Sequence, residues 1–405
     1  MCSFFFNVNC CHFDIELLHG SIHHISAGTQ RDVIKLGKLK NLLQSEFVFR
    51  LVYLADRDVY SLPREEKRNI SKLYNKMPLN GLKKLAPQID WDRYFNSLLV
   101  DKESKGAAAG HGQLHPEEFM AILDDIDWMD EQTRQRARAK AQAIQPYIGY
   151  PEELLKDVLV EEHYSKVTLK PDAYFENVMR LRKWSTDYAL GQLRKPHIKG
   201  DWKRFAQVAV VDAYYSDVEN CIRIPAGILQ GVFFSKDRPS YLNYGAIGSI
   251  IGHEITHGFD DEGRQFDKDG SIINWWEPET DLKFRQRAQC IVEQYGNYTV
   301  AEGTMNVNGI NTQGENIADN GGIKEAFNAY KKWVKENGPE AGLPGLKYTP
   351  QQLFWISAAN IWCSKYRPEA LKLSILAGAH SPAPFSRSLM RLLTTVSPVD
   401  DLTNF

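Results

Sequence analysis

The stretch around which the chain is organised reads Gly252-His253-Glu254-Ile255-Thr256-His257-Gly258-Phe259-Asp260-Asp261. Its two histidines are four residues apart, so on an α-helix they share one face. Two imidazoles on one face can bind one Zn²⁺, and Glu254 can take a proton from a water molecule that the metal activates. The alternative is a surface helix that carries two histidines by chance. Other parts of the sequence are needed to distinguish it from a zinc site.

A helix is predicted over residues 243–259. Its isoleucines recur on the side expected to be buried, at positions 247, 250, 251 and 255. Three glycines (245, 248 and 252) lower its helix propensity, so we expect burial to stabilise it.

A third metal ligand is expected from Gly314-Glu315-Asn316-Ile317-Ala318-Asp319-Asn320-Gly321-Gly322. A catalytic zinc needs three protein ligands and one open position. Glu315 and Asp319 share a helix face, so one carboxylate can ligate the metal while the other accepts the N–H of a ligating histidine. An ordinary helix with an acidic pair is the alternative, but the two like charges would repel mildly. Occurrence together with the histidine motif favours a zinc site.

The bulk composition is that of a globular chain. Its 405 residues are enough for two or three domains, with 43% hydrophobic and 25% charged residues. A net charge of −2, from 49 basic and 51 acidic residues, gives no indication of nucleic acid or an anionic membrane as partner. We predict no membrane span, since no apolar run reaches about 18 residues. We predict no signal peptide, since the N-terminus lacks a basic region.

The cysteines do not indicate a metal site. Six are present without C-x-x-C spacing, at positions 2, 10, 11, 221, 290 and 363. Buried thiols of a cytosolic enzyme are one interpretation. N-glycosylation sequons at 69–71 and 297–299 would fit a secreted protein, although such short motifs also occur by chance. The compartment therefore remains open on these features.

The predicted fold is mainly α with a small β-sheet. Residues 1–30 cluster Cys and His without ligand spacing, so a disordered leader is favoured over a metal site. Helices are expected over 31–105, a loop over 106–115, one long helix with a solvated charged face over 116–145, and further helices over 152–207. Short strands are predicted at 208–215 and 222–227, where valine, isoleucine and tyrosine gather.

Over roughly residues 60–385 the sequence resembles the neprilysin/endothelin-converting-enzyme family of zinc metallopeptidases. Besides the two zinc stretches, the matching segments are Tyr74–Met77, Ala213–Tyr215, Ile224–Gln230, Leu242–Gly245 and Ile361–Pro368. The resemblance implies a thermolysin-like catalytic domain over 208–385, preceded by part of an outer helical domain over 31–155 and a helical connection over 156–207. Within the catalytic domain, residues 247–260 would form the floor of the active site and residues 208–215 its substrate-facing edge.

The resemblance also implies residue roles. One Zn²⁺ would be held by His253, His257 and Glu315. Catalytic roles would fall to Glu254, His380 and Asp319, with Asp260 supporting His257. Small peptides would bind against Asp212 and Ala213, and an apolar pocket that favours cleavage on the amino side of hydrophobic residues would be lined by Ile228, Phe233, Ile250, Ile361 and Trp362.

The chain departs from the family at several points. Asp212 stands where the family has Asn, and Ser386 stands where it has Arg, with Arg387 one position later. Residues 386–405 are expected to be an aberrant tail. Family members are longer, disulfide-bonded glycoproteins at the cell surface or outside the cell, so Cys290 and Cys363 would lack their partners here. An impaired fragment that retains only zinc and peptide binding is therefore one alternative. A metalloprotein without peptidase activity, or a structural helical protein, is another.

Overall fold

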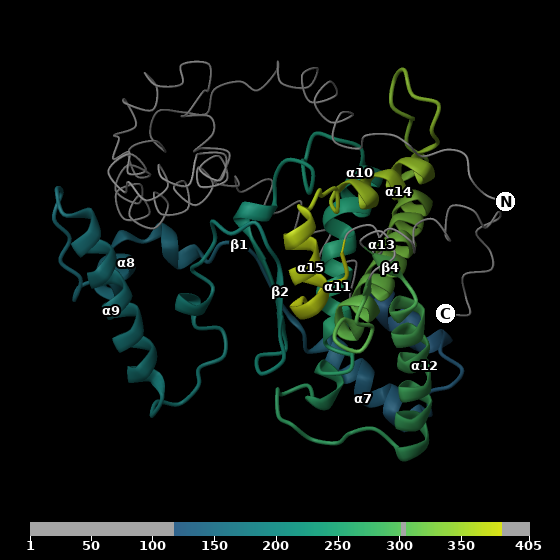
Figure 1. Ribbon diagram of the computed structural model, residues 1–405, viewed down its shortest axis with the longest axis horizontal. Coiled ribbons are helices and arrows are strands. Elements are labelled where there is room, and N and C mark those ends of the chain that lie inside the picture. Colours follow the sequence, from purple (N-terminus) through teal and green to yellow (C-terminus); the bar gives the residue numbers. More distant parts are fainter. Residues whose placement is uncertain (1–116, 301–304, 383–405) are drawn as a thin grey trace. The chain divides into compact units, whose positions relative to one another are not determined.

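The computed structural model describes residues 117–300 and 305–382 of the chain (Figure 1). Two compact units divide them: the first contains 117–149 together with 210–300 and 305–382, and the second contains 150–209. The leader, the helices expected over 31–105, the loop at 106–115 and the tail, including Ser386 and Arg387, lie outside the described residues.

The single helix predicted over 116–145 is in fact two helices followed by a strand. A helix over 117–125 is separated from α7 (Glu131–Gln142) by an irregular turn. Asp130 caps α7, because its Oδ1 accepts the N–H of Thr133 at 2.9 Å. Arg134 donates to the carbonyls of Ile126 at 2.7 Å and Met129 at 2.9 Å, which fixes the turn. These local contacts interrupt the single helix that the sequence pattern over 116–145 predicts.

The small sheet has the order β1-β3-β2. β1 (Gln145–Gly149), which was not predicted, runs parallel to β3 (Cys221–Pro225), and β2 (Tyr214–Ser216) pairs antiparallel with β3. Residues 208–213, predicted as strand, are not in the sheet. The β2–β3 ladder begins where Tyr214 faces Arg223, and two positions further on it would meet Pro225, which has no N–H to donate. The second predicted strand is confirmed over 222–225, and 226–227 belong to the 3₁₀ turn η4 (Ala226–Ile228).

The predicted helix at 243–259 is present, with shifted ends and one irregular turn. It consists of α10 (Ser240–Asn243), the π-helical turn η5 (Tyr244–Gly248) and α11 (Ser249–His257). Three of the isoleucines predicted to be buried, at 247, 251 and 255, are completely buried, whereas Ile250 is half-buried. Burial thus stabilises a segment that its glycines alone would weaken.

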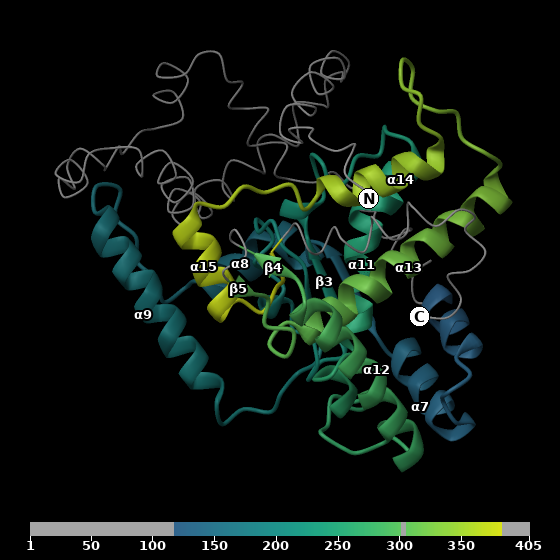
Figure 2. The same ribbon diagram turned by 45° about the vertical axis from the view of Figure 1, so that its right-hand side comes forward.

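The long helix α13 (Gln313–Asn337) packs against α11 along its first half (Figure 2). Where Gly252 and Gly322 meet, the two backbones themselves are in contact. A Cβ atom on Gly252 would lie 2.6 Å from the carbonyl oxygen of Gly322, and one on Gly322 would lie 2.2 Å from the backbone nitrogen of His253. No side chain fits between the two helices at this level.

Gly322→Ala should therefore lower the free energy of unfolding by about 2 kcal/mol or more, since the added methyl group forces the two backbones apart. The matched control is Gly296→Ala at the end of α12, where an added Cβ meets nothing within 4 Å. That control should be neutral or raise stability by about 0.5 kcal/mol. Chemical denaturation of both variants checks the difference, and equal stabilities would contradict the close packing.

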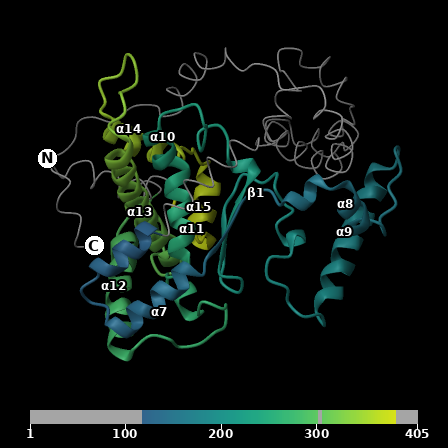
Figure 3. The ribbon, with the colours of Figure 1, turned by 180° about the vertical axis from the view of Figure 1, so that it is seen from behind.

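An aromatic cluster fixes the far half of α13. α14 (Pro350–Asn360) and α10 pack there around Tyr241, Tyr330 and Phe354, with Trp362 against the edge of the cluster. Figure 3 shows α11, α13 and α14 from behind, with α7 at the lower end of α11. The first unit also contains α12 (Pro278–Gly296), α15 (Pro368–Ala377) and a two-stranded ribbon of β4 (Thr299–Val300) and β5 (Met305–Asn306).

The second unit is helical, as expected for 152–207. Its elements are η2 (Glu152–Leu155), α8 (Asp157–His163), α9 (Tyr174–Gln192) and η3 (Trp202–Arg204). His163 lies among the rings of Tyr164, Trp184, Tyr188 and Trp202, with centroids 4.8 to 5.5 Å away. No helix in the described ranges is long and apolar enough to cross a membrane.

Candidate active site

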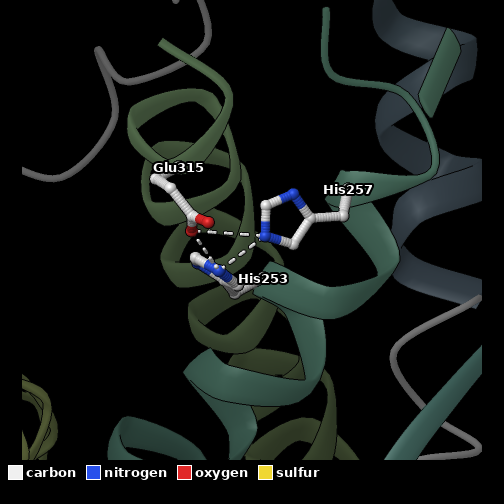
Figure 4. Close-up of side chains that lie close together, drawn as sticks. All are labelled: His253, His257 and Glu315. Atoms are coloured by element: carbon white, nitrogen blue, oxygen red, sulfur yellow. Dashed lines mark hydrogen bonds and ion pairs between the residues drawn. The ribbon is translucent and has the colours of Figure 1, made fainter. Parts of the chain in front are cut away.

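Three side chains from two helices converge at one point (Figure 4). His253 and His257 project from α11, and Glu315 projects from the first turn of α13. The two imidazole Nε2 atoms are 2.9 Å apart, and Glu315 Oε2 lies 3.2 Å from that of His253 and 3.3 Å from that of His257. The three residues that the sequence predicted as ligands are therefore brought together.

The donor set fits a zinc ion. Glu315 Oε2 is buried, and the Nε2 atoms of His253 and His257 lie 3.2 and 3.3 Å from it. Without a cation the histidines would have to carry the positive charge. Burial lowers the pKa of His257, but hydrogen bonds with Asp260 and Glu315 outweigh it and raise the pKa to about 9. Two imidazoles and one carboxylate are typical ligands of a zinc ion that keeps one open position.

Each histidine is oriented from behind by a carboxylate. His253 Nδ1 lies 3.0 Å from Asp319 Oδ1, and His257 Nδ1 lies 2.6 Å from Asp260 Oδ2. With Nδ1 bonded in this way, each Nε2 is left free to bind a metal ion. Asp260 is itself fixed, because its Oδ1 accepts the backbone N–H groups of Glu262 at 2.9 Å and Gly263 at 2.7 Å.

Asp319→Asn should weaken zinc binding by about 10- to 100-fold, because the amide keeps the shape but removes the charge that orients and polarises His253. Competition with a chromophoric chelator measures the Kd. The control is Glu279→Gln, an acidic residue on α12 whose side chain is 79% exposed. Equal zinc affinity of the Asp319 variant and the wild type would show that His253 is oriented by other contacts.

Glu254 is placed as a buried carboxyl beside the triad. It is 5% exposed and follows His253 directly on α11. Burial raises its pKa to about 7, although the charges of His253 and His257 act against the rise. A carboxyl with this pKa can both accept and release a proton near neutral pH.

His380 also reaches the site, from the loop after α15. Its Nδ1 lies 3.2 Å from Glu315 Oε2, and its side chain is 62% exposed. The neighbouring Ser381 is buried and donates its hydroxyl to Asn316 Oδ1 at 2.8 Å, so this loop is tied to α13 one residue beyond Glu315. From the sequence alone His380 is an unremarkable loop histidine, and only the family resemblance selects it.

Within the described ranges, no hydrogen bond or ion pair joins the residues predicted to bind substrate to the triad, but the charge of Asp212 acts on Glu254 and contributes to its raised pKa. Asp212 is exposed and Ala213 half-buried, just before β2, and Asp212 Oδ1 accepts the N–H of Ala213 at 3.0 Å. Of the predicted pocket residues, Trp362 packs against the aromatic cluster of α13 and α14. The others are buried (Ile228) or half-buried (Phe233, Ile250, Ile361). Their role in a pocket stays a prediction.

Lys140 is the residue of this region that the sequence analysis missed. The charges of its helix were interpreted as a solvated face, but Lys140 is 1% exposed and its ammonium bonds the chain just after His257. A signal was present: Thr133, Ala137, Lys140 and Ala141 recur at helical spacing and form the buried face of α7. A lysine within a stripe of small residues should have been recognised as buried and hydrogen-bonded.

Comparison with known proteins agrees with this geometry. Residues 212–391 match a model described as peptidase family M13, and residues 49–110 and 116–151 match a second model of the same description. The chain belongs to peptidase family M13. The resemblance to neprilysin-type metallopeptidases is thereby confirmed, and the matched region extends to residue 391, beyond the point where the tail was expected to diverge.

Individual M13 relatives give the extent of the likeness. Neprilysin-2 of Drosophila melanogaster is 51% identical over 283 residues, which cover 70% of this chain and 36% of that protein. Human neprilysin is 46% identical over 271 residues, covering 66% of this chain and 36% of that protein. The matched stretch is thus about a third of each relative's length.

Among solved structures, the Mycobacterium tuberculosis zinc metalloprotease Zmp1 in complex with an inhibitor has a TM-score of 0.64 at 32% identity. That match covers 82% of this chain and 47% of the other. The predicted fold class, a mainly α zinc metallopeptidase with a small sheet, is confirmed. No disulfide forms among Cys221, Cys290 and Cys363, the cysteines within the described ranges.

Proposed function

We propose that this chain is a zinc-dependent endopeptidase that hydrolyses small peptides. The observation that carries the proposal is the convergence of His253, His257 and Glu315 beside the buried carboxyl of Glu254. Membership in the M13 family supports it. One zinc ion per chain is proposed, because the described residues bring together a single group of three candidate ligands.

The chemistry divides between the metal and the side chains. When bound, Zn²⁺ lowers the pKa of a water molecule and polarises the carbonyl of the scissile peptide bond. The Glu254 carboxylate takes a proton from the attacking water and hands it to the nitrogen of the leaving amine. We infer that His380, which lies beside Glu315 and is largely exposed, donates a hydrogen bond to the developing oxyanion. Asp319 and Asp260 hold the two histidine rings in position.

For the substrate, we infer a peptide that adds to the edge of the sheet. β2 is an edge strand of the order β1-β3-β2, and Asp212 and Ala213 lie immediately before it. An extended peptide can pair with such an edge through main-chain hydrogen bonds. Cleavage on the amino side of hydrophobic residues follows if Ile228, Phe233, Ile250, Ile361 and Trp362 line the adjoining pocket.

A peptide assay tests the proposed function. The chain 1–405 is incubated with quenched fluorogenic peptides that differ only in the residue after the scissile bond, Leu or Phe against Asp. We expect turnover of the hydrophobic peptides alone, abolished by a chelator and restored by added zinc. Zinc and peptide binding without turnover would support the impaired fragment instead, and a chain that binds no zinc would overturn the proposal.

An extracellular or cell-surface location is part of the proposal. The sequon Asn297-Tyr298-Thr299 begins at the C-terminal end of α12, and Asn297 is exposed. An exposed asparagine there can accept a glycan in the secretory pathway. Expression through that pathway should give a product whose mass falls on treatment with an N-glycosidase. Asn297→Gln should reduce that mass loss by one glycan, and an unchanged loss would exclude glycosylation at this site.

A further inference from the structure

Lys140 makes a complete set of hydrogen bonds inside the protein. Its Nζ donates to the backbone carbonyls of Gly258 at 2.6 Å, Gly263 at 2.6 Å and Phe266 at 2.7 Å. An ammonium group has three N–H donors, so all of them are used. The segment 258–266 is thus wrapped around one buried cation supplied by α7.

The three carbonyls belong to the segment that follows the second histidine. Gly258 directly follows His257 and caps α11, where helix carbonyls lack intrahelical partners. A positive charge at this end also complements the helix dipole. Between the carbonyls of Gly258 and Gly263 lies Asp260, whose Oδ2 bonds His257 Nδ1 and whose Oδ1 accepts the N–H of Gly263. Lys140 therefore anchors both ends of the loop that holds Asp260.

The backbone of Lys140 is also bonded to the β2–β3 hairpin. Asn220, which adopts a positive φ of 49° in the turn between β2 and β3, donates its amide to the carbonyls of Lys140 and Lys268, each at 3.1 Å. Tyr215 of β2 donates its hydroxyl to Asn220 Oδ1 at 2.7 Å. These contacts fix the end of α7, and so the backbone of Lys140, against the β2–β3 hairpin.

From this network we propose that Lys140 is a positioning residue of the metal site. Its ammonium fixes the loop 258–266, and the loop places Asp260 so that His257 presents Nε2 to the metal. The inference rests on the proposed zinc site. It adds to that site a positioning residue that lies about 120 positions before Asp260 in the chain. Burial lowers the pKa of Lys140 to about 8, while Asp217, Asp260 and Asp267 act to raise it, so the group remains largely charged at neutral pH.

The test uses Lys140→Met, which keeps most of the volume and removes the donors, with Lys283→Met on α12 as the matched surface control. The zinc Kd is measured by chelator competition, and Co²⁺ replaces zinc so that the visible spectrum reports ligand geometry. We expect a Kd about 10- to 100-fold higher and an altered Co²⁺ spectrum for Lys140→Met, and no change for Lys283→Met. A Kd and spectrum equal to those of the wild type would overturn the inference.

A double-mutant cycle separates positioning from a general structural role. If Lys140 acts through Asp260, Lys140→Met should weaken zinc binding little further in a chain that already carries Asp260→Asn. Additive losses in the double variant would contradict this route. Leu353→Ala, in the aromatic cluster of α13 and α14, serves as a destabilised control that should retain the wild-type Kd in its folded fraction.

The zinc Kd of a second Lys140 variant and the folding of both variants complete the test. Lys140→Gln, which keeps part of the hydrogen bonding, should have an intermediate Kd. If neither Lys140 variant folds even in the cold, the residue is needed for folding and the positioning role is rejected. If the wild-type chain itself binds no zinc, the proposed function fails, whereas wild-type binding with unaffected Lys140 variants removes this inference alone.

Discussion

Replacement of Glu254 by glutamine should lower kcat about 10³-fold while zinc binding is retained. The amide has the size of the carboxyl but cannot take a proton from water, and general base catalysis typically contributes a factor of this order. Because Glu254 is not one of the three converging candidate ligands, its replacement should leave those ligands in place. Peptide turnover and zinc content of the same preparation measure the two effects.

Glu325→Gln is the matched control for this prediction. Glu325 is also a buried glutamate, 1% exposed on α13, and its Oε1 accepts the hydroxyl of Thr256 at 2.9 Å. Burial raises its pKa well above the ordinary value, which favours the neutral carboxyl that glutamine resembles. The control should keep most of the turnover. If Glu254→Gln keeps it too, another group acts as the base.

His257→Ala should weaken zinc binding by two to three orders of magnitude. Structural zinc sites with four ligands have apparent binding free energies of about 10–16 kcal/mol, so one ligand is worth roughly 3–4 kcal/mol. The variant also leaves the Asp260 carboxylate without its imidazole partner. Isothermal titration with zinc, or chelator competition if the wild type binds too tightly, gives the difference.

His163→Ala is the control for the histidine prediction. His163 ends α8 in the second unit, among aromatic rings, and is not one of the three converging ligands. Its replacement should leave the zinc Kd unchanged. Comparable losses in both variants would show that instability of the chain, rather than loss of a ligand, weakens the binding.

Local sequence patterns predicted the centre of the site well. The spacing of His253 and His257 requires only an α-helix to bring the two rings together, and the isoleucines around them indicate that helix. The pairing of Glu315 with Asp319 is equally local. The structure brings these side chains together as their helical spacing predicts, and their roles in binding a metal stay a prediction.

Features that depend on tertiary contacts were predicted poorly. The strand at 208–215 was wrong over most of its length, because its partner strand reaches Pro225 and then turns into η4. β1 was missed because it lies parallel to β3 and its pairing residues are more than 70 positions away in the chain. Lys140 was assigned to a solvated face because only the folded loop 258–266 supplies the carbonyls that satisfy it. His380 has no local pattern that distinguishes it, so the family resemblance was needed to find it.

Titration of the metal-free chain with zinc, followed by peptide turnover, tests the central claim most directly. If His253, His257 and Glu315 hold one catalytic ion, turnover of a hydrophobic fluorogenic peptide should rise with added zinc and reach its plateau at one ion per chain. Turnover that does not depend on zinc, or zinc binding that never produces turnover, would contradict the account.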